Sequence, residues 1–84
     1  MKEIFSPTGI HHQLAKKIQL LRFTSGWSQE TLAELADVHR NYIGHVERLE
    51  VNVGLAHLEK IAKAFDMPIH ELLNMQTHET RNPP

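Results

Sequence analysis

The sequence of 84 residues contains no cysteine. This absence excludes a disulfide framework, a thiolate nucleophile and a cysteine zinc site, and it is compatible with a reducing compartment. Long apolar runs are missing too. No stretch reaches the roughly 18 residues of a membrane span or, near the N-terminus, the roughly 7 to 15 of a signal peptide. We therefore expect a cytoplasmic protein with no membrane partner.

An excess of positive charge is also missing. The formal net charge is -1 and the sequence pI is about 6.6, which argues against a protein that binds DNA through bulk positive charge. The charges are unevenly distributed, however. Residues 1–27 carry four cations against one acid, and residues 28–54 carry two cations against five acids. Any DNA contact must therefore be local and geometric.

The apolar residues predict one all-helical domain. They make up 40% of the chain, enough for one compact core and too few for a regulatory domain beside it, so we expect no small-molecule effector domain. Helical spacing predicts helices at residues 10–23, 29–36, 40–49 and 55–65, then a short one beginning at Pro68. We expect an N-terminal extension at residues 1–9, the domain at 10–74 and a polar, disordered tail at 75–84.

Several apolar positions recur at helical spacing and are expected to line the core. In the first, second and fourth helices they are Ile10, Leu14, Ile18 and Leu21; Leu32, Ala33, Leu35 and Ala36; and Leu55, Leu58, Ile61, Ala62 and Phe65. Local signals mark the helix ends. Gly26 can close the first helix in the left-handed conformation, Ser28 can cap the second, and Asp37 tolerates the sharp turn after it. Pro68 suits the first turn of the fifth helix.

The third helix has two distinct sides on a helical wheel. One side holds Ile43, Val46, Glu47 and Glu50, and the opposite side holds Asn41, Gly44, His45 and Arg48. A helix with a polar outer side, preceded by a short helix and a tight turn, fits the major groove, which is about 12 Å wide. Gly44 would let the backbone approach base edges or phosphates closely.

These residues match a known pattern. The string SQETLAELADVHRNYIGHVE, followed by LEKIAKAFDMPIHELL, resembles the Cro and phage-repressor type of helix-turn-helix, the Xre family, over residues 10–73. The resemblance implies a compact five-helix, lambda-repressor-like fold and DNA binding. It assigns the contacts to Ser28, Gln29, His39, Arg40, Asn41, Tyr42, Gly44, His45, Arg48 and Asn52.

Within this set the resemblance separates two roles. The base-facing positions are Arg40, Asn41, Gly44 and His45. Arginine can bind guanine through two hydrogen bonds, asparagine can do the same with adenine, and histidine can donate to or accept from a base edge. Gln29 falls at a helix N-terminus, where free N–H groups attract phosphate. Tyr42, Arg48 and the Asn52 loop fall where the family touches the DNA backbone.

The resemblance also implies a structural ion pair between Arg22 and Glu47. Two departures from the family pattern concern turns. Asp37 replaces the usual turn glycine, and Leu49 replaces the glycine that ends the recognition helix. The second departure indicates either a longer helix or a differently shaped loop through Glu50.

Other sites are weakly supported. The chain has seven histidines, but none has the HExxH spacing, so we expect no metal. No nucleophile, base and acid pattern or glycine-rich phosphate loop occurs, so we expect no enzyme and no cofactor. Trp27 is interpreted as a core or boundary aromatic rather than a ligand anchor. Lys16 and Lys17 are interpreted equally well as solvated residues or as phosphate contacts.

The sequence therefore predicts a transcriptional regulator that binds duplex DNA as a homodimer on a roughly palindromic operator. The segment RNYIGHVE is most similar to restriction-modification controller proteins. The alternative is a protein-interaction module, such as an antitoxin or co-regulator, with secondary DNA contact. The negative net charge favours the alternative slightly, and the polar outer side of the third helix favours DNA.

Overall fold

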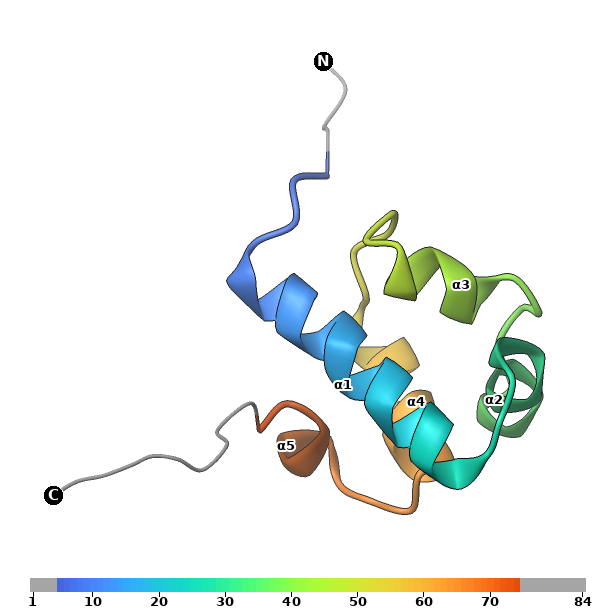
Figure 1. Cartoon of the computed structure of the whole chain (residues 1–84). Helices are drawn as coiled ribbons and strands as arrows, with labels where there is room; N and C mark the ends of the chain where they lie inside the picture. The colour runs from blue at the N-terminus through green and yellow to red at the C-terminus, as the bar shows by residue number, and fades with distance from the viewer. Residues whose placement is uncertain (1–4, 75–84) are drawn as a thin grey trace, which may run out of the picture.

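The computed structural model describes residues 5–74, and within this range every regular element is a helix (Figure 1). The helices are α1 (Gly9–Ser25), α2 (Gln29–Ala36), α3 (Tyr42–Glu47), α4 (Leu55–Ala64) and α5 (Ile69–Leu72). The predicted all-α, five-helix fold is confirmed. The expected tail at residues 75–84 lies outside the described residues. Within residues 5–74, no helix is long and apolar enough to cross a membrane.

The helices pack around one core. α1 contacts α3 and α5, while α2 contacts α3 and α4 (Figure 1). Each helix contributes one large, fully buried side chain: Ile18, Leu32, Ile43, Ile61 and Leu72. Burial of such a side chain stabilises the folded state by roughly 1.5–3 kcal/mol. All five helices therefore contribute to the same core.

Three positions expected in the core are exposed instead. Ile10, Leu35 and Leu55 have exposed fractions of 53%, 54% and 73%. Ile10 and Leu55 stand in the first turns of α1 and α4. Leu35 is one residue before Ala36, which takes the core-facing position on α2, so the Leu35 side chain points about 100° away.

Helices α1 to α4 end in the same way. The residue that closes each has a positive φ: Gly26 (74°), Asp37 (59°), Leu49 (63°) and Asp66 (59°). The next amide N–H then donates to a carbonyl five residues earlier: Trp27 to Arg22, Val38 to Ala33, Glu50 to His45, and Met67 to Ala62. This is the Schellman arrangement, which satisfies carbonyl groups at the helix end. The predicted turns at Gly26 and Asp37 are confirmed.

The third helix is shorter than expected. It spans Tyr42–Glu47 rather than residues 40–49. The prediction that Leu49 would lengthen the helix is therefore wrong. Leu49 adopts the left-handed conformation even though it is not glycine. In a non-glycine residue this conformation costs roughly 1–2 kcal/mol. Core burial of Ile43 and Val46 just before it holds the turn in place.

Two further local predictions concern helix starts. The Ser28 Oγ accepts a hydrogen bond from the Thr31 amide at 3.0 Å, which confirms Ser28 as the cap of α2. Pro68 is the residue before α5 and not part of its first turn. Trp27 is half-buried and stacks on Phe65 with ring centroids 5.3 Å apart. Its interpretation as a boundary aromatic is confirmed.

Candidate nucleic-acid interface

The predicted DNA-contacting residues converge on α3 and on the turn before it. His39 and Arg40 lie in this turn, and Asn41 immediately precedes the helix as its N-cap. All three are exposed. The Asn41 amide donates to Nδ1 of His39 at 3.1 Å, which fixes the shape of the turn. Two of the four expected base-facing residues therefore come from the turn, and only Gly44 and His45 come from α3 itself.

The body of α3 is held by a buried carboxylate. Glu47 Oε2 accepts from Nε of Arg22 at 2.9 Å, and Oε1 accepts from Nη2 of Arg22 at 3.0 Å. The two side chains are only 9% and 4% exposed. The predicted ion pair is therefore present, in a side-on geometry with two parallel hydrogen bonds. A third Arg22 hydrogen bond, from Nη1 to the Trp27 carbonyl at 3.0 Å, ties the pair to the α1–α2 turn.

Gln29 belongs to the same network. Its Nε2 donates to Glu47 Oε1 at 2.9 Å, so Arg22, Gln29 and Glu47 join α1, α2 and α3 through one carboxylate. Sequence reasoning placed Gln29 at the α2 N-terminus as a phosphate contact but missed this bond. The bond orients the amide along the α2–α3 surface.

Gly44 is buried rather than open. A Cβ at this position would lie 3.0 Å from Nη1 of Arg48 and 3.1 Å from Oε1 of Gln29. The close approach of DNA to the Gly44 backbone stays a prediction, and it requires the Arg48 and Gln29 side chains that cover the glycine to move aside. The missing side chain instead lets Gln29 and Arg48 pack across the outer side of α3.

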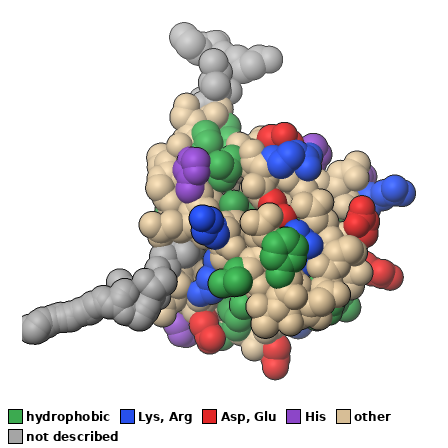
Figure 2. All heavy atoms as spheres, viewed as in Figure 1, with side chains coloured by type: hydrophobic (Ala, Val, Ile, Leu, Met, Phe, Trp, Pro, Cys, Tyr) green, Lys and Arg blue, Asp and Glu red, His purple; other side chains and the backbone are tan. Residues whose placement is uncertain are grey.

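Glu50 lies beside His45 and Arg48 and not on the core side, where the wheel placed it. Its Oε1 lies 2.7 Å from His45 Nδ1, and its Oε2 accepts from Arg48 Nε at 3.0 Å. Because α3 stops at Glu47 and Leu49 reverses the chain, Glu50 folds back over the last helical turn. Hydrogen bonds from Arg48 and then His45 lower the pKa of the Glu50 carboxyl. Figure 2 shows acidic, basic and histidine side chains side by side at this end of α3.

Tyr42 joins the start of α3 to α4. Its ring stacks on His57 with centroids 4.5 Å apart and an interplanar angle of 27°. Burial raises the pKa of the Tyr42 phenol above its usual value of 10.0. The stacking positions the phenol at the edge of the α3 surface.

Asn52 follows the α3 turn and is linked to the N-terminal segment. Nδ1 of His11 accepts from the Thr8 amide at 2.9 Å, so the ring proton is on Nε2, which lies 3.2 Å from Oδ1 of Asn52. Phe5 packs edge-on against His11 with centroids 4.8 Å apart. Residues 5–8, expected as an extension, therefore pack against α1 and help to position the Asn52 loop. A contact between residues 41 apart has no local sequence signal.

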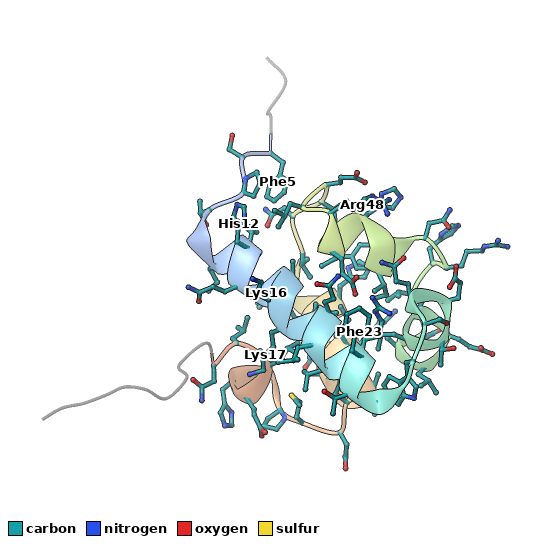
Figure 3. All side chains as sticks on the ribbon, viewed as in Figure 1. Phe5, His12, Lys16, Lys17, Phe23 and Arg48 are labelled. Atoms are coloured by element: carbon teal, nitrogen blue, oxygen red, sulfur yellow. The ribbon has the colours of Figure 1, made fainter. Side chains whose placement is uncertain are left out.

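The two lysines of α1 have different environments (Figure 3). Lys17 Nζ donates to the Glu71 carbonyl at 3.1 Å and to the Asn74 carbonyl at 2.9 Å. These bonds hold the end of α5 against α1, so Lys17 has a structural role that neither sequence interpretation included. Lys16 is exposed, and both interpretations remain for it. No group of metal-ligating side chains occurs among residues 5–74.

The arrangement of α2, a tight turn and α3 with a polar outer side defines a helix-turn-helix DNA-binding protein. Comparison with known proteins agrees. Residues 18–72 match the helix-turn-helix family HTH_3. The chain belongs to this family of DNA-binding transcriptional regulators.

Several named proteins are similar to this chain. Control protein C.SmaI from Serratia marcescens is 44% identical over 63 residues, which cover 75% of each chain. The solved structure of the restriction-modification controller protein C.AhdI from Aeromonas hydrophila is similar with a TM-score of 0.72 and 38% identity, covering 77% of this chain and 98% of that one. The controller protein C.Esp1396I, solved as a tetramer with its natural 35 base-pair operator, is similar with a TM-score of 0.71 and 27% identity, covering 80% and 92%.

Proposed function

We propose that this protein is a cytoplasmic, sequence-specific regulator of the restriction-modification controller type, and that it acts as a homodimer on a roughly two-fold symmetric operator. The observation that carries the proposal is that the inner side of α3 is fixed in the core while the residues at its start are exposed. Its inner side is fixed by the buried Arg22–Glu47 pair, whereas Arg40 and Asn41 at its start are exposed. A rigid helix with free polar side chains at its leading end is suited to reading base edges.

We assign base recognition to Arg40, Asn41 and His45. An arginine can bind guanine through two hydrogen bonds, and an asparagine can do the same with adenine. The Arg40 and Asn41 side chains are exposed, and His45 is partly exposed and bonded to the exposed Glu50, so contact with DNA would not disrupt the core. Gly44 contributes by its small size, since it lets Gln29 and Arg48 lie across α3.

We assign contacts with the DNA backbone to a second group of residues, on the flanks of α3. It consists of Ser28, Gln29, His39, Tyr42, Arg48 and Asn52. Contacts of this kind fix the register of the protein on the duplex without reading sequence. Local contacts also suit a chain with a formal net charge of -1, because bulk attraction to DNA is absent.

A dimer is supported by the small size of the surface that one copy offers. One short helix-turn-helix rarely binds tightly alone, and two copies place their recognition helices in successive major grooves about 10 to 10.5 base pairs apart. The similar controller C.Esp1396I binds its operator as a tetramer, which supports assembly on DNA.

Selection from a library of randomised duplexes tests the proposal directly. We expect a consensus with two related half-sites and dissociation constants in the range of about 10⁻⁸ to 10⁻¹¹ M, roughly a thousandfold or more below those for random duplexes. Sedimentation with the selected duplex should show two protein chains per site. Recovery of no consensus, or one chain on a single half-site, would contradict the proposal.

A second candidate function is supported by α1. Leu20 and Phe23 are 61% and 63% exposed on its outer side, and Figure 3 shows Phe23 projecting from this helix. Two apolar side chains one turn apart suit a protein partner. In an interaction module, Phe23→Ala would abolish partner binding, and the library would give no consensus.

A further inference from the structure

Glu50 is an acid in a place where DNA binding should disfavour one. Its carboxylate is 46% exposed and lies against His45 and Arg48, two of the proposed DNA-contacting residues. A negative charge this close to the phosphates lowers affinity for every duplex. Glu50 must therefore contribute something else if the surface is to bind DNA well.

The geometry at His45 indicates what that contribution is. A carboxylate only accepts hydrogen bonds, so the 2.7 Å contact with Glu50 Oε1 requires the proton of the ring to be on Nδ1. In the neutral imidazole, Nε2 is then an acceptor. Because Nδ1 faces Glu50, Nε2 lies on the far side of the ring, and the half-exposed side chain leaves it open to a ligand.

An acceptor selects particular bases in the major groove. The exocyclic amines of cytosine and adenine donate there, while guanine presents only acceptors. The opposite tautomer of His45 would donate from Nε2 and favour guanine. The choice of tautomer therefore decides which base His45 reads.

We propose that Glu50 is a specificity-determining, positioning residue: by holding the proton of His45 on Nδ1, it presents Nε2 as an acceptor for cytosine or adenine. This inference rests on the proposed function. Arg48 strengthens the arrangement, because its Nε and Nη2 bonds to Glu50, at 3.0 and 3.3 Å, fix the carboxylate in front of the ring.

The test uses Glu50→Gln, which keeps the size of the side chain but not its acceptor-only character. An amide can accept from Nδ1–H or donate to bare Nδ1, so both tautomers become populated. We expect preference at one base pair of the selected operator to fall about fivefold, the value of one hydrogen bond. Affinity for random duplexes should rise, since a negative charge is lost.

Two controls separate this role from a general effect of charge. Glu34→Gln removes an exposed acid of α2 and should leave the base preference unchanged. In a His45→Ala background, Glu50→Gln should no longer change the preference. If Glu50→Gln alters cognate and random duplexes by the same factor, the proposal is overturned. Failure of the proposed function would look different, because the unmodified protein would then show no preference.

Nitrogen-15 NMR of the free protein provides a readout that needs no DNA. We expect the His45 Nδ1 and Nε2 shifts to report the Nδ1–H tautomer in the unmodified protein and a mixture in Glu50→Gln. A dominant Nε2–H tautomer in the unmodified protein, or a ring protonated on both nitrogens at the pH of the binding assay, would overturn the proposal, because Nε2 would then be a donor.

Discussion

Arg22 and Glu47, 25 residues apart in the chain, meet through two parallel hydrogen bonds of 2.9 and 3.0 Å. The pair crosses from α1 to α3, and its carboxylate also accepts from Gln29 of α2. Because both charges are almost fully buried, removal of one leaves the other without compensation.

Arg22→Ala should therefore lower the free energy of unfolding by roughly 3–5 kcal/mol, because Glu47 becomes a buried, unpaired charge. Urea unfolding followed by circular dichroism measures this. DNA binding should weaken only as the folded fraction falls. Gln19→Ala, which changes an exposed residue of the same helix, is the matched control and should have little effect. An Arg22→Ala protein that unfolds at the parent urea concentration would contradict the burial argument.

Leu49 offers a test of backbone strain. Its φ of 63° is unfavourable for any residue with a Cβ. Leu49→Gly and Leu49→Ala both remove the side chain beyond Cβ, but only glycine relieves the strain. We expect the glycine variant to be more stable than the alanine variant by about 1 kcal/mol. Equal stability in thermal unfolding would mean that the turn can relax.

Tyr42, the only tyrosine in the chain, gives a pH prediction. Burial raises its pKa above 10.0, so the phenol of the unfolded chain ionises first as pH rises. The resulting contribution to stability is fully present below pH of about 10 and is lost as pH rises through the higher folded value. Absorbance titration should show a midpoint above 10.0 in the native protein. In Tyr42→Phe the alkaline loss of stability should be smaller, and a native midpoint at or below that of the unfolded chain would contradict the prediction.

Base readers and phosphate contacts should respond differently. Arg40→Ala or Asn41→Ala should cost roughly 1–3 kcal/mol on the selected operator and almost nothing on random duplexes, because only base edges differ between them. Arg48→Ala should weaken both and reduce the salt slope by about one. Fluorescence anisotropy at several salt concentrations measures these values. If Arg40→Ala lowers affinity for both duplexes by the same factor, Arg40 contacts the DNA phosphates and not a base edge.

The sequence predicts elements well where the signals are local. The bounds of α2 follow from Ser28 and Asp37, one an N-cap and the other a residue that tolerates positive φ. The end of α3 could not be predicted in this way, because leucine disfavours the conformation that Leu49 adopts. Core packing on both sides of the turn overrides the local preference.

The contacts of the candidate site also differ in how well the sequence predicts them. Family resemblance identified Arg22 and Glu47, which the structure joins. The wheel placed Glu50 on the wrong side because it assumed that the helix continued. The contact of His11 with Asn52 and the packing of Gln29 and Arg48 over Gly44 depend on tertiary structure, so no spacing in the sequence predicts them.

The shared way in which α1 to α4 end has a kinetic consequence. At each of these helix ends, the closing hydrogen bond joins a carbonyl and an amide within a segment of six residues. The unfolded chain can therefore settle its helix boundaries by local search, before distant segments meet. Helical domains of this kind fold on timescales of about microseconds to milliseconds. A newly synthesised copy would then reach its native state much faster than a ribosome adds the next residue, at about 5–20 residues per second.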